Sequence, residues 1–149
     1  MPGRHQPAAW ERSGVYGRGM PLELVRSPAL SDRAPYAYAS RVSGGSLVFT
    51  AGACPLDEQG RIGPVGDYAG QAEHVMRNLV TALGAAGAIL EDVAKTTVYV
   101  ATDRREDLLA VWEIVRTAFG DHHPPSTLLA VPVLGYEDQL VEVEAVAVT

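Results

Sequence analysis

The sequence predicts an α+β domain in which two helices cover one face of a mixed sheet of about six strands. Three observations predict this class: two apolar stripes with helical period, several short runs rich in Val and Thr, and hairpins mixed with helical crossovers. The 149 residues suffice for one domain, and 47% hydrophobic with 20% charged residues is typical of a folded globular chain.

Residues 1–20 are rich in Gly, Arg, Pro and Ser and carry no helix or strand period. We therefore expect a flexible N-terminal extension over residues 1–20 and a single domain over residues 21–149. Two interpretations of the extension stay open: a segment without a role, including a true start at Met20, or a functional arm.

The domain opens with short strand patterns. An apolar run at 22–26 ends at Ser27-Pro28, and two further runs at 38–42 and 47–51 flank a Ser-Gly-Gly-Ser turn. Because Gly-rich turns between apolar runs are typical of hairpins, this pattern predicts that the strands at 38–42 and 47–51 pair with each other.

Two helices and three more strands follow. Asp67 is a good N-cap for the first helix and Asp103 for the second, which Gly120 and Pro124-Pro125 bring to an end. Apolar residues recur at spacings of three and four in each helix: Ala72, Val75, Met76, Leu79, Val80 and Leu83, then Leu108, Val111, Trp112, Val115 and Phe119. Strands are predicted at 93–100, 127–131 and 140–148.

Composition excludes several classes of protein. The net charge of −6 argues against nucleic-acid binding, and no run approaches the roughly 20 apolar residues of a membrane span. Cys54 is the single cysteine, so no internal disulfide forms, and no Cys and His spacing is typical of a metal site. The N-terminus lacks the apolar segment of a secretory signal, and we expect a cytoplasmic protein.

The last strand carries two carboxylates in an apolar run. Val141, Val143, Ala145 and Ala147 fall on one face, whereas Glu142 and Glu144 share the other face with Val146 and Val148. A face that is acidic at one end and apolar at the other suits a subunit interface or a cleft. A partly desolvated glutamate there is a candidate general acid or base, and a pair of solvated or salt-bridged carboxylates is the alternative.

Several motifs now fall into a recognisable order between residues 25 and 148. They are Ala34-Pro35-Tyr36, the run 47–52 followed by Pro55-Leu56, Gln71-Ala72 with Asn78-Leu79, Ala85-Ala86-Gly87-Ala88, the run 92–100 and the run 141–148. In this order and spacing the chain resembles the Rid family, also called YjgF/YER057c or L-PSP endoribonuclease-like. The resemblance implies a chorismate-mutase-like fold and a homotrimer. Its sheets would form a central barrel, with small-molecule ligands in three clefts between subunits.

The resemblance also implies a chemistry. Archetypal members hydrolyse reactive imines or enamines to 2-oxo acids and ammonia, without a cofactor or a metal. Carried over to this chain, Glu142 matches the glutamate that activates water and Tyr36 the tyrosine that closes the cleft. The backbone at Ala51 and Gly52 matches the strand end that holds the ligand, although a serine is usual in place of Ala51.

Four further positions depart from the family pattern. Ser126 stands where an arginine usually binds the substrate carboxylate, and Leu128, two residues on past Thr127, replaces a common cysteine. Trp112 replaces a common asparagine and Leu108 a common aromatic residue. A bidentate arginine contact is worth about 1.5–3 kcal/mol, so we expect a larger or less polar substrate than small 2-imino acids. A non-catalytic trimer that binds a small metabolite is the alternative.

Other residues keep two interpretations each. Cys54 is either a small buried residue or a neighbour of the cleft, and Lys95 is either structural or a Schiff-base lysine. His122 and His123 belong to a loop from which either could reach the cleft as an acid or base. Three arginines could compensate for the missing one: Arg41, Arg104 and Arg105.

Overall fold

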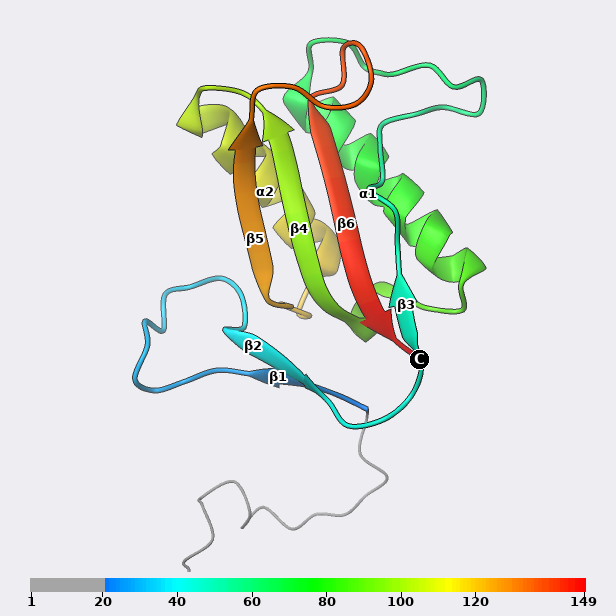
Figure 1. The fold of residues 1–149 in the computed structure, drawn as a ribbon. Helices are drawn as coiled ribbons and strands as arrows, with labels where there is room; N and C mark the ends of the chain where they lie inside the picture. Colours follow the sequence, from blue (N-terminus) through cyan, green and yellow to red (C-terminus); the bar gives the residue numbers. More distant parts are fainter. Residues whose placement is uncertain (1–20) are drawn as a thin grey trace, which may run out of the picture.

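A computed structural model describes residues 21–149, so the expected extension over residues 1–20 lies outside the described part of the chain. Within that part the elements follow the predicted order (Figure 1). They are β1 (Leu22–Val25), β2 (Ala39–Val42), β3 (Leu47–Phe49), α1 (Tyr68–Ala85), the short 3₁₀ turn η2 (Leu90–Asp92), β4 (Val93–Ala101), α2 (Arg105–Phe119), β5 (Ser126–Val131) and β6 (Val141–Val148).

The six strands form two sheets, and the expectation of a single six-stranded sheet is wrong. A four-stranded sheet has the order β3-β6-β4-β5, with β4 and β5 parallel and the other pairs antiparallel. The strands β1 and β2 form a separate antiparallel pair below it (Figure 1). The main sheet is therefore mixed, as predicted, but smaller.

The predicted hairpin between residues 38–42 and 47–51 is also wrong, because β2 pairs with β1 and β3 pairs with β6. The Ser-Gly-Gly-Ser segment carries the chain from one sheet to the other. Gly45 has a φ of 85°, and Ser46 exchanges two backbone hydrogen bonds with Thr149 at the end of β6. The local turn signal was present, but the long C-terminal strand offers β3 a better partner than β2 does.

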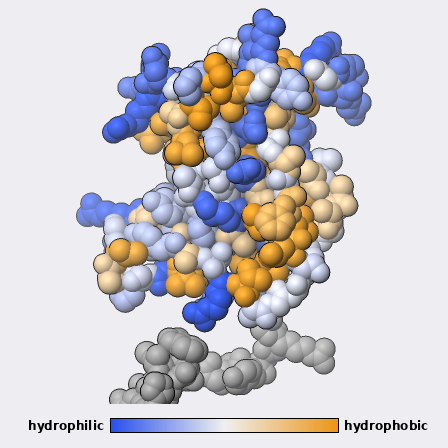
Figure 2. Space-filling model, viewed as in Figure 1, coloured by the Kyte–Doolittle hydropathy of each residue, from blue (hydrophilic) through white to orange (hydrophobic). Residues whose placement is uncertain are grey.

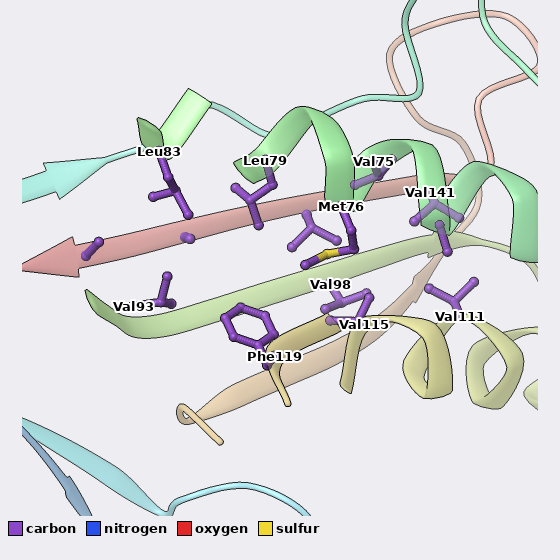
Figure 3. Packing of buried hydrophobic residues seen from close by; sticks show 14 of the residues in the cluster. Val75, Met76, Leu79, Leu83, Val93, Val98, Val111, Val115, Phe119 and Val141 are labelled. Carbon is purple, nitrogen blue, oxygen red and sulfur yellow. The ribbon is translucent and has the colours of Figure 1, made fainter. Parts of the chain in front are cut away.

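Both helices pack on one face of the four-stranded sheet, as predicted, and the core lies between these layers (Figure 3). Asp67 caps α1 by accepting a hydrogen bond from the Gly70 N–H at 2.9 Å. Asp103 does not cap α2. Arg104 occupies the N-cap position without a side-chain cap hydrogen bond, and the preceding Thr102 accepts a hydrogen bond from the Arg104 N–H and donates one to the Asp107 carboxylate.

Within residues 21–149 no helix covers the opposite face of the sheet, which we call the open face. On β6, Val141, Val143, Ala145 and Ala147 are buried under the helices, and Glu142, Glu144 and Val146 are half-buried on the open face. Phe49, the cross-strand partner of Val146, is 70% exposed there. Apolar and charged side chains lie next to one another on this side of the molecule (Figure 2). In residues 21–149 no helix combines the length and apolar character that a membrane crossing requires.

Candidate functional site

Glu142 lies at the centre of a polar cluster beside the chain that follows β3. Its Oε2 accepts a hydrogen bond from Gln139 Nε2 at 3.0 Å and lies 3.7 Å from Cys54 Sγ. Its Oε1 stands directly over Gly52: a Cβ at that position would lie 2.5 Å from Glu142 Cδ and closer still to Oε1. Only glycine leaves room for the carboxylate in this orientation.

Backbone pairing explains why Gly52 lies beside Glu142. After β3 the chain continues along β6: the Thr50 N–H donates to Ala145 O at 3.0 Å, and the Ala53 N–H donates to Val143 O at 2.7 Å. Asn78 of α1 then fixes the following segment by donating to the carbonyls of Cys54 and Leu56. Residues 51 and 52 therefore run past the Glu142 side chain.

Cys54 is half-buried and contacts the Glu142 carboxylate, so the interpretation of a neighbour to the cluster describes its position better than that of a purely buried residue. Desolvation, followed by the nearby Glu142 charge, raises the pKa of the Cys54 thiol to about 11. The sulfur is therefore a protonated thiol at neutral pH and a poor nucleophile.

A second polar group lies on the open face around Glu144, two residues after Glu142 on β6. Glu144 accepts a hydrogen bond from the Tyr99 hydroxyl at 2.8 Å, and this bond raises the pKa of Tyr99. Lys95 Nζ donates to Thr96 O and to Thr127 Oγ1, each at 2.8 Å. Desolvation lowers the pKa of Lys95, and the Glu144 charge acts in the opposite direction. Glu144 is thus tied to a structural network rather than to Gly52.

The other predicted site residues gather near α2. The rings of Tyr36 and Trp112 meet edge to face, with centroids 6.3 Å apart. Ser126 Oγ is hydrogen-bonded to Thr96 Oγ1, and Ser126 and Trp112 line one small hollow under α2. Leu108 and Leu128 pack against the core.

The strand β5 alternates its faces, and this divides three residues that were expected to act together. Ser126 and Leu128 pair with Thr96 and Val98, which face the helices. Thr127 points to the open face, where its hydroxyl accepts from Lys95. Ser126 and Leu128 therefore lie on the side of the sheet that faces the helices, and Thr127 lies on the open face.

Within one subunit, the predicted site residues lie in two separate groups on opposite sides of the sheet. Glu142 is on β6 and faces the open side, whereas Ser126 is on β5 and faces α2, with β4 between the two strands. Glu142 and Gly52 are brought together, and so are Tyr36, Trp112 and Ser126. Nothing in residues 21–149 joins these two groups within a single subunit by a hydrogen bond or a ring contact.

Two residues near these groups were missed by the sequence reasoning. Arg116 lines the same hollow as Ser126, and its position four residues after Trp112 on the helix was a usable signal. Gln139, which is 4% exposed, carried no such signal because it lies in a loop before β6. The three arginines considered earlier do not line that hollow; Arg41 pairs with Glu23 and Arg104 with Glu106.

The adjacent residues His122 and His123 lie beside the small hollow that Ser126 lines. His122 Nε2 lies 2.7 Å from the Val93 carbonyl and therefore carries the proton of that hydrogen bond. His122 and His123 both line the hollow of Ser126. Among residues 21–149, no three His, Cys, Asp or Glu side chains form a group that could hold a metal ion.

The chain is similar in sequence to a known protein family and to several of its members. Residues 28–149 match the family model described as endoribonuclease L-PSP. A RutC family protein of Pyrococcus abyssi is 37% identical over 114 residues, which are 76% of this chain and 85% of the relative. The 3-aminoacrylate deaminase RutC of Acinetobacter baylyi is 29% identical over 132 residues, 86% of this chain and 98% of that protein.

The chain is also similar to solved structures, in both sequence and fold. The structure of E. coli TdcF with bound serine is 30% identical, with a TM-score of 0.62, and the match covers 88% of this chain and 99% of TdcF. The mixed sheet, the two helices on one face and the match over residues 28–149 lead to one conclusion: the chain belongs to the L-PSP endoribonuclease family, also called the YjgF or Rid family.

Proposed function

We propose that the chain is a deaminase-like hydrolase of a reactive imine or enamine, acting in clefts between the subunits of a homotrimer. The observation that carries the proposal is the Glu142 carboxylate, which is held by Gln139 through one oxygen and presents the other oxygen above Gly52. A relative of this chain is named a 3-aminoacrylate deaminase, and its substrate is an enamine.

The division of the predicted residues supports an assembly. Glu142 and the Tyr36–Trp112 pair lie on different sides of one subunit, so a cleft that contains both needs a second copy of the chain. The open face of the sheet supplies a surface for this contact, because it exposes Leu129 on β5 and Phe49 on β3, whose cross-strand partner is the half-buried Val146. Covering such apolar side chains is the usual driving force for assembly.

The chemistry follows from the position of Glu142. Its Oε1 accepts a proton from a water molecule, and the hydroxide formed attacks the carbon of the C=N bond while the nitrogen is protonated. The resulting carbinolamine collapses to a carbonyl group, and its nitrogen leaves as ammonia. An enamine first takes up a proton at carbon to become the imine, so the overall reaction consumes one water and releases one ammonia.

In the proposed cleft, the wall opposite Glu142 is formed by Tyr36, Trp112 and Ser126, and this wall determines which substrate fits. The Ser126 hydroxyl is already hydrogen-bonded to Thr96, and the nearby Arg116 is 2.8 Å from Glu113 in an ion pair. Neither group replaces a free arginine as a partner for a substrate carboxylate. Tyr36 and Trp112 add aromatic surface to the same wall. This wall therefore favours a substrate that is larger or less polar than small 2-imino acids.

Ammonia release tests the proposal. Imines and enamines are generated in the assay from amino acids by a pyridoxal-phosphate enzyme or an amino-acid oxidase, with small polar and bulky apolar members compared. We expect acceleration for apolar members and little for 2-aminoacrylate or 2-iminobutyrate. If no member of the panel is turned over faster than in buffer, the hydrolase proposal is wrong.

The engaged Ser126 hydroxyl also favours the second candidate, a trimer that binds a small metabolite without reaction. In that case a compound from the panel should raise the melting temperature progressively as its concentration rises above its Kd, without any release of ammonia. Thermal shift and ammonia assays on the same compounds separate the two functions.

A further inference from the structure

The orientation of the Gln139 amide is fixed by two backbone groups. Gln139 Oε1 accepts a hydrogen bond from the Tyr136 N–H at 3.1 Å, and Nε2 donates to Val141 O at 3.2 Å. A flipped amide would place its oxygen against a carbonyl and its NH₂ against an N–H, and both contacts would be lost. Since the side chain is buried, water cannot replace these partners.

This orientation makes Gln139 a donor toward Glu142. The same Nε2 lies 3.0 Å from Glu142 Oε2 and 3.2 Å from Cys54 Sγ. The Cys54 thiol, itself 3.7 Å from Oε2, can donate only to that oxygen or to the Gly52 carbonyl. The amide therefore donates to Oε2, the thiol has only Oε2 of this carboxylate within reach, and neither group contacts Oε1.

We propose that Gln139 is a positioning residue for Glu142: it holds Oε2 and so directs Oε1 over Gly52 toward the substrate. The functional part of this inference rests on the proposed hydrolysis, whereas the geometric part does not. Without the amide, no donor within residues 21–149 other than the weak thiol keeps the Glu142 side chain in this rotamer.

A second buried glutamine provides a matched control. Gln71 of α1 donates to Pro64 O and Asp138 O, and it accepts from the Leu140 N–H. It therefore fastens the same loop before β6 without contacting Glu142. A variant at Gln71 shows the effect of loosening this loop alone, whereas a variant at Gln139 also removes the hydrogen-bond donor to Glu142.

Cys54 serves as a reporter that needs no substrate. Its pKa is raised by desolvation and, next, by the Glu142 charge, so neutralising Glu142 increases the thiolate fraction and the rate of alkylation by iodoacetamide. A charge about 4 Å away changes this rate by roughly fivefold or more. We expect Glu142→Gln to speed alkylation of Cys54 by at least that factor at pH 8.5 in the wild-type background.

The decisive comparison is a double-mutant cycle. In a Gln139→Met background, which keeps the volume but lacks the N–H, Glu142→Gln should change the alkylation rate by less than about twofold. In a Gln71→Met background the full effect should remain. An equal effect of Glu142→Gln in the Gln139→Met and wild-type backgrounds would overturn the positioning role. Should Gln139→Met fail to fold, Gln139→Glu, which replaces the donor with an acceptor, enters the same cycle.

The activity arm separates this inference from the proposed function. With an accepted imine substrate, Gln139→Met should lower kcat about tenfold or more and leave KM nearly unchanged, because the lost contact orients the base rather than the substrate. A change confined to KM would overturn the positioning role. Absence of turnover in the wild type would refute the hydrolase proposal, while the alkylation cycle would still decide the geometry.

Discussion

Gly52→Ala is the sharpest perturbation of the candidate site, because the space over this glycine is filled by Glu142. A Cβ at residue 52 would stand 2.5 Å from Glu142 Cδ and 2.7 Å from Cγ, and real Cβ atoms are not found so close to another heavy atom. The obstacle is a side chain rather than backbone, so the carboxylate can rotate away while the sheet stays folded.

The magnitude follows from the contacts that this rotation breaks. The hydrogen bond from Gln139 to the carboxylate is worth about 1.5–3 kcal/mol, and the stiffer unfolded chain of alanine offsets about 0.4–1 kcal/mol of that loss. We therefore expect the free energy of unfolding to fall by about 1–2 kcal/mol. Turnover should fall further, by about 10²–10⁴-fold, because the general base leaves its position.

The assay compares Gly52→Ala with Gly44→Ala, a loop glycine whose Cβ would meet no heavy atom within 4 Å. Urea denaturation measures stability, ammonia release measures turnover, and alkylation of Cys54 reports whether the carboxylate has left the sulfur. Gly44→Ala should match the wild type in all three. Wild-type turnover by Gly52→Ala, with unchanged alkylation, would refute the argument that Glu142 occupies this space and acts from it.

Three further expectations test other parts of the account. Leu129→Asp, on the exposed part of the open face, should dissociate the trimer into folded monomers by placing a charge in an apolar contact; a trimer mass by light scattering at micromolar concentration contradicts this. Ser126→Arg should raise the turnover of small 2-imino acids above the weak wild-type level, and an unchanged rate speaks against the carboxylate argument. Gly84→Ala should stabilise α1 by about 0.5–1 kcal/mol, seen as a higher urea midpoint with an unchanged m-value, because no atom lies within 4 Å of the added methyl group; a lower midpoint would contradict it.

Local physical rules predicted the parts of the fold that depend on short stretches of chain. The Asp67 cap, the stripes of both helices apart from the exposed Val80, and the alternation of β6 all follow from side-chain chemistry and period. Asp103 was the wrong cap because α2 begins one residue later than expected, at Arg105, with Arg104 at the N-cap position. The pairing of β3 with β6 could not be predicted, since it depends on a partner about 100 residues away in the chain.

The candidate site was predictable to a similar extent. The resemblance picked out Glu142 and Gly52, and the structure shows them in contact. Gln139 escaped notice because a buried glutamine in a loop has no sequence period, and its partners are set by the tertiary fold alone. The alternation of β5, which puts Thr127 on the other side of the sheet from Ser126 and Leu128, follows a rule that was available from the sequence.

The central claim is that Glu142 carries the chemistry, and the most direct measurement compares the turnover of Glu142→Gln and Glu144→Gln on the best imine or enamine substrate. Gln keeps the size of the side chain but cannot take a proton from water. We expect Glu142→Gln to be slower by about 10²–10⁴-fold as an intact trimer. Glu144→Gln should stay near the wild-type rate, because Glu144 is bound to Tyr99 and lies away from Gly52. Wild-type turnover by a trimeric Glu142→Gln variant would contradict the account.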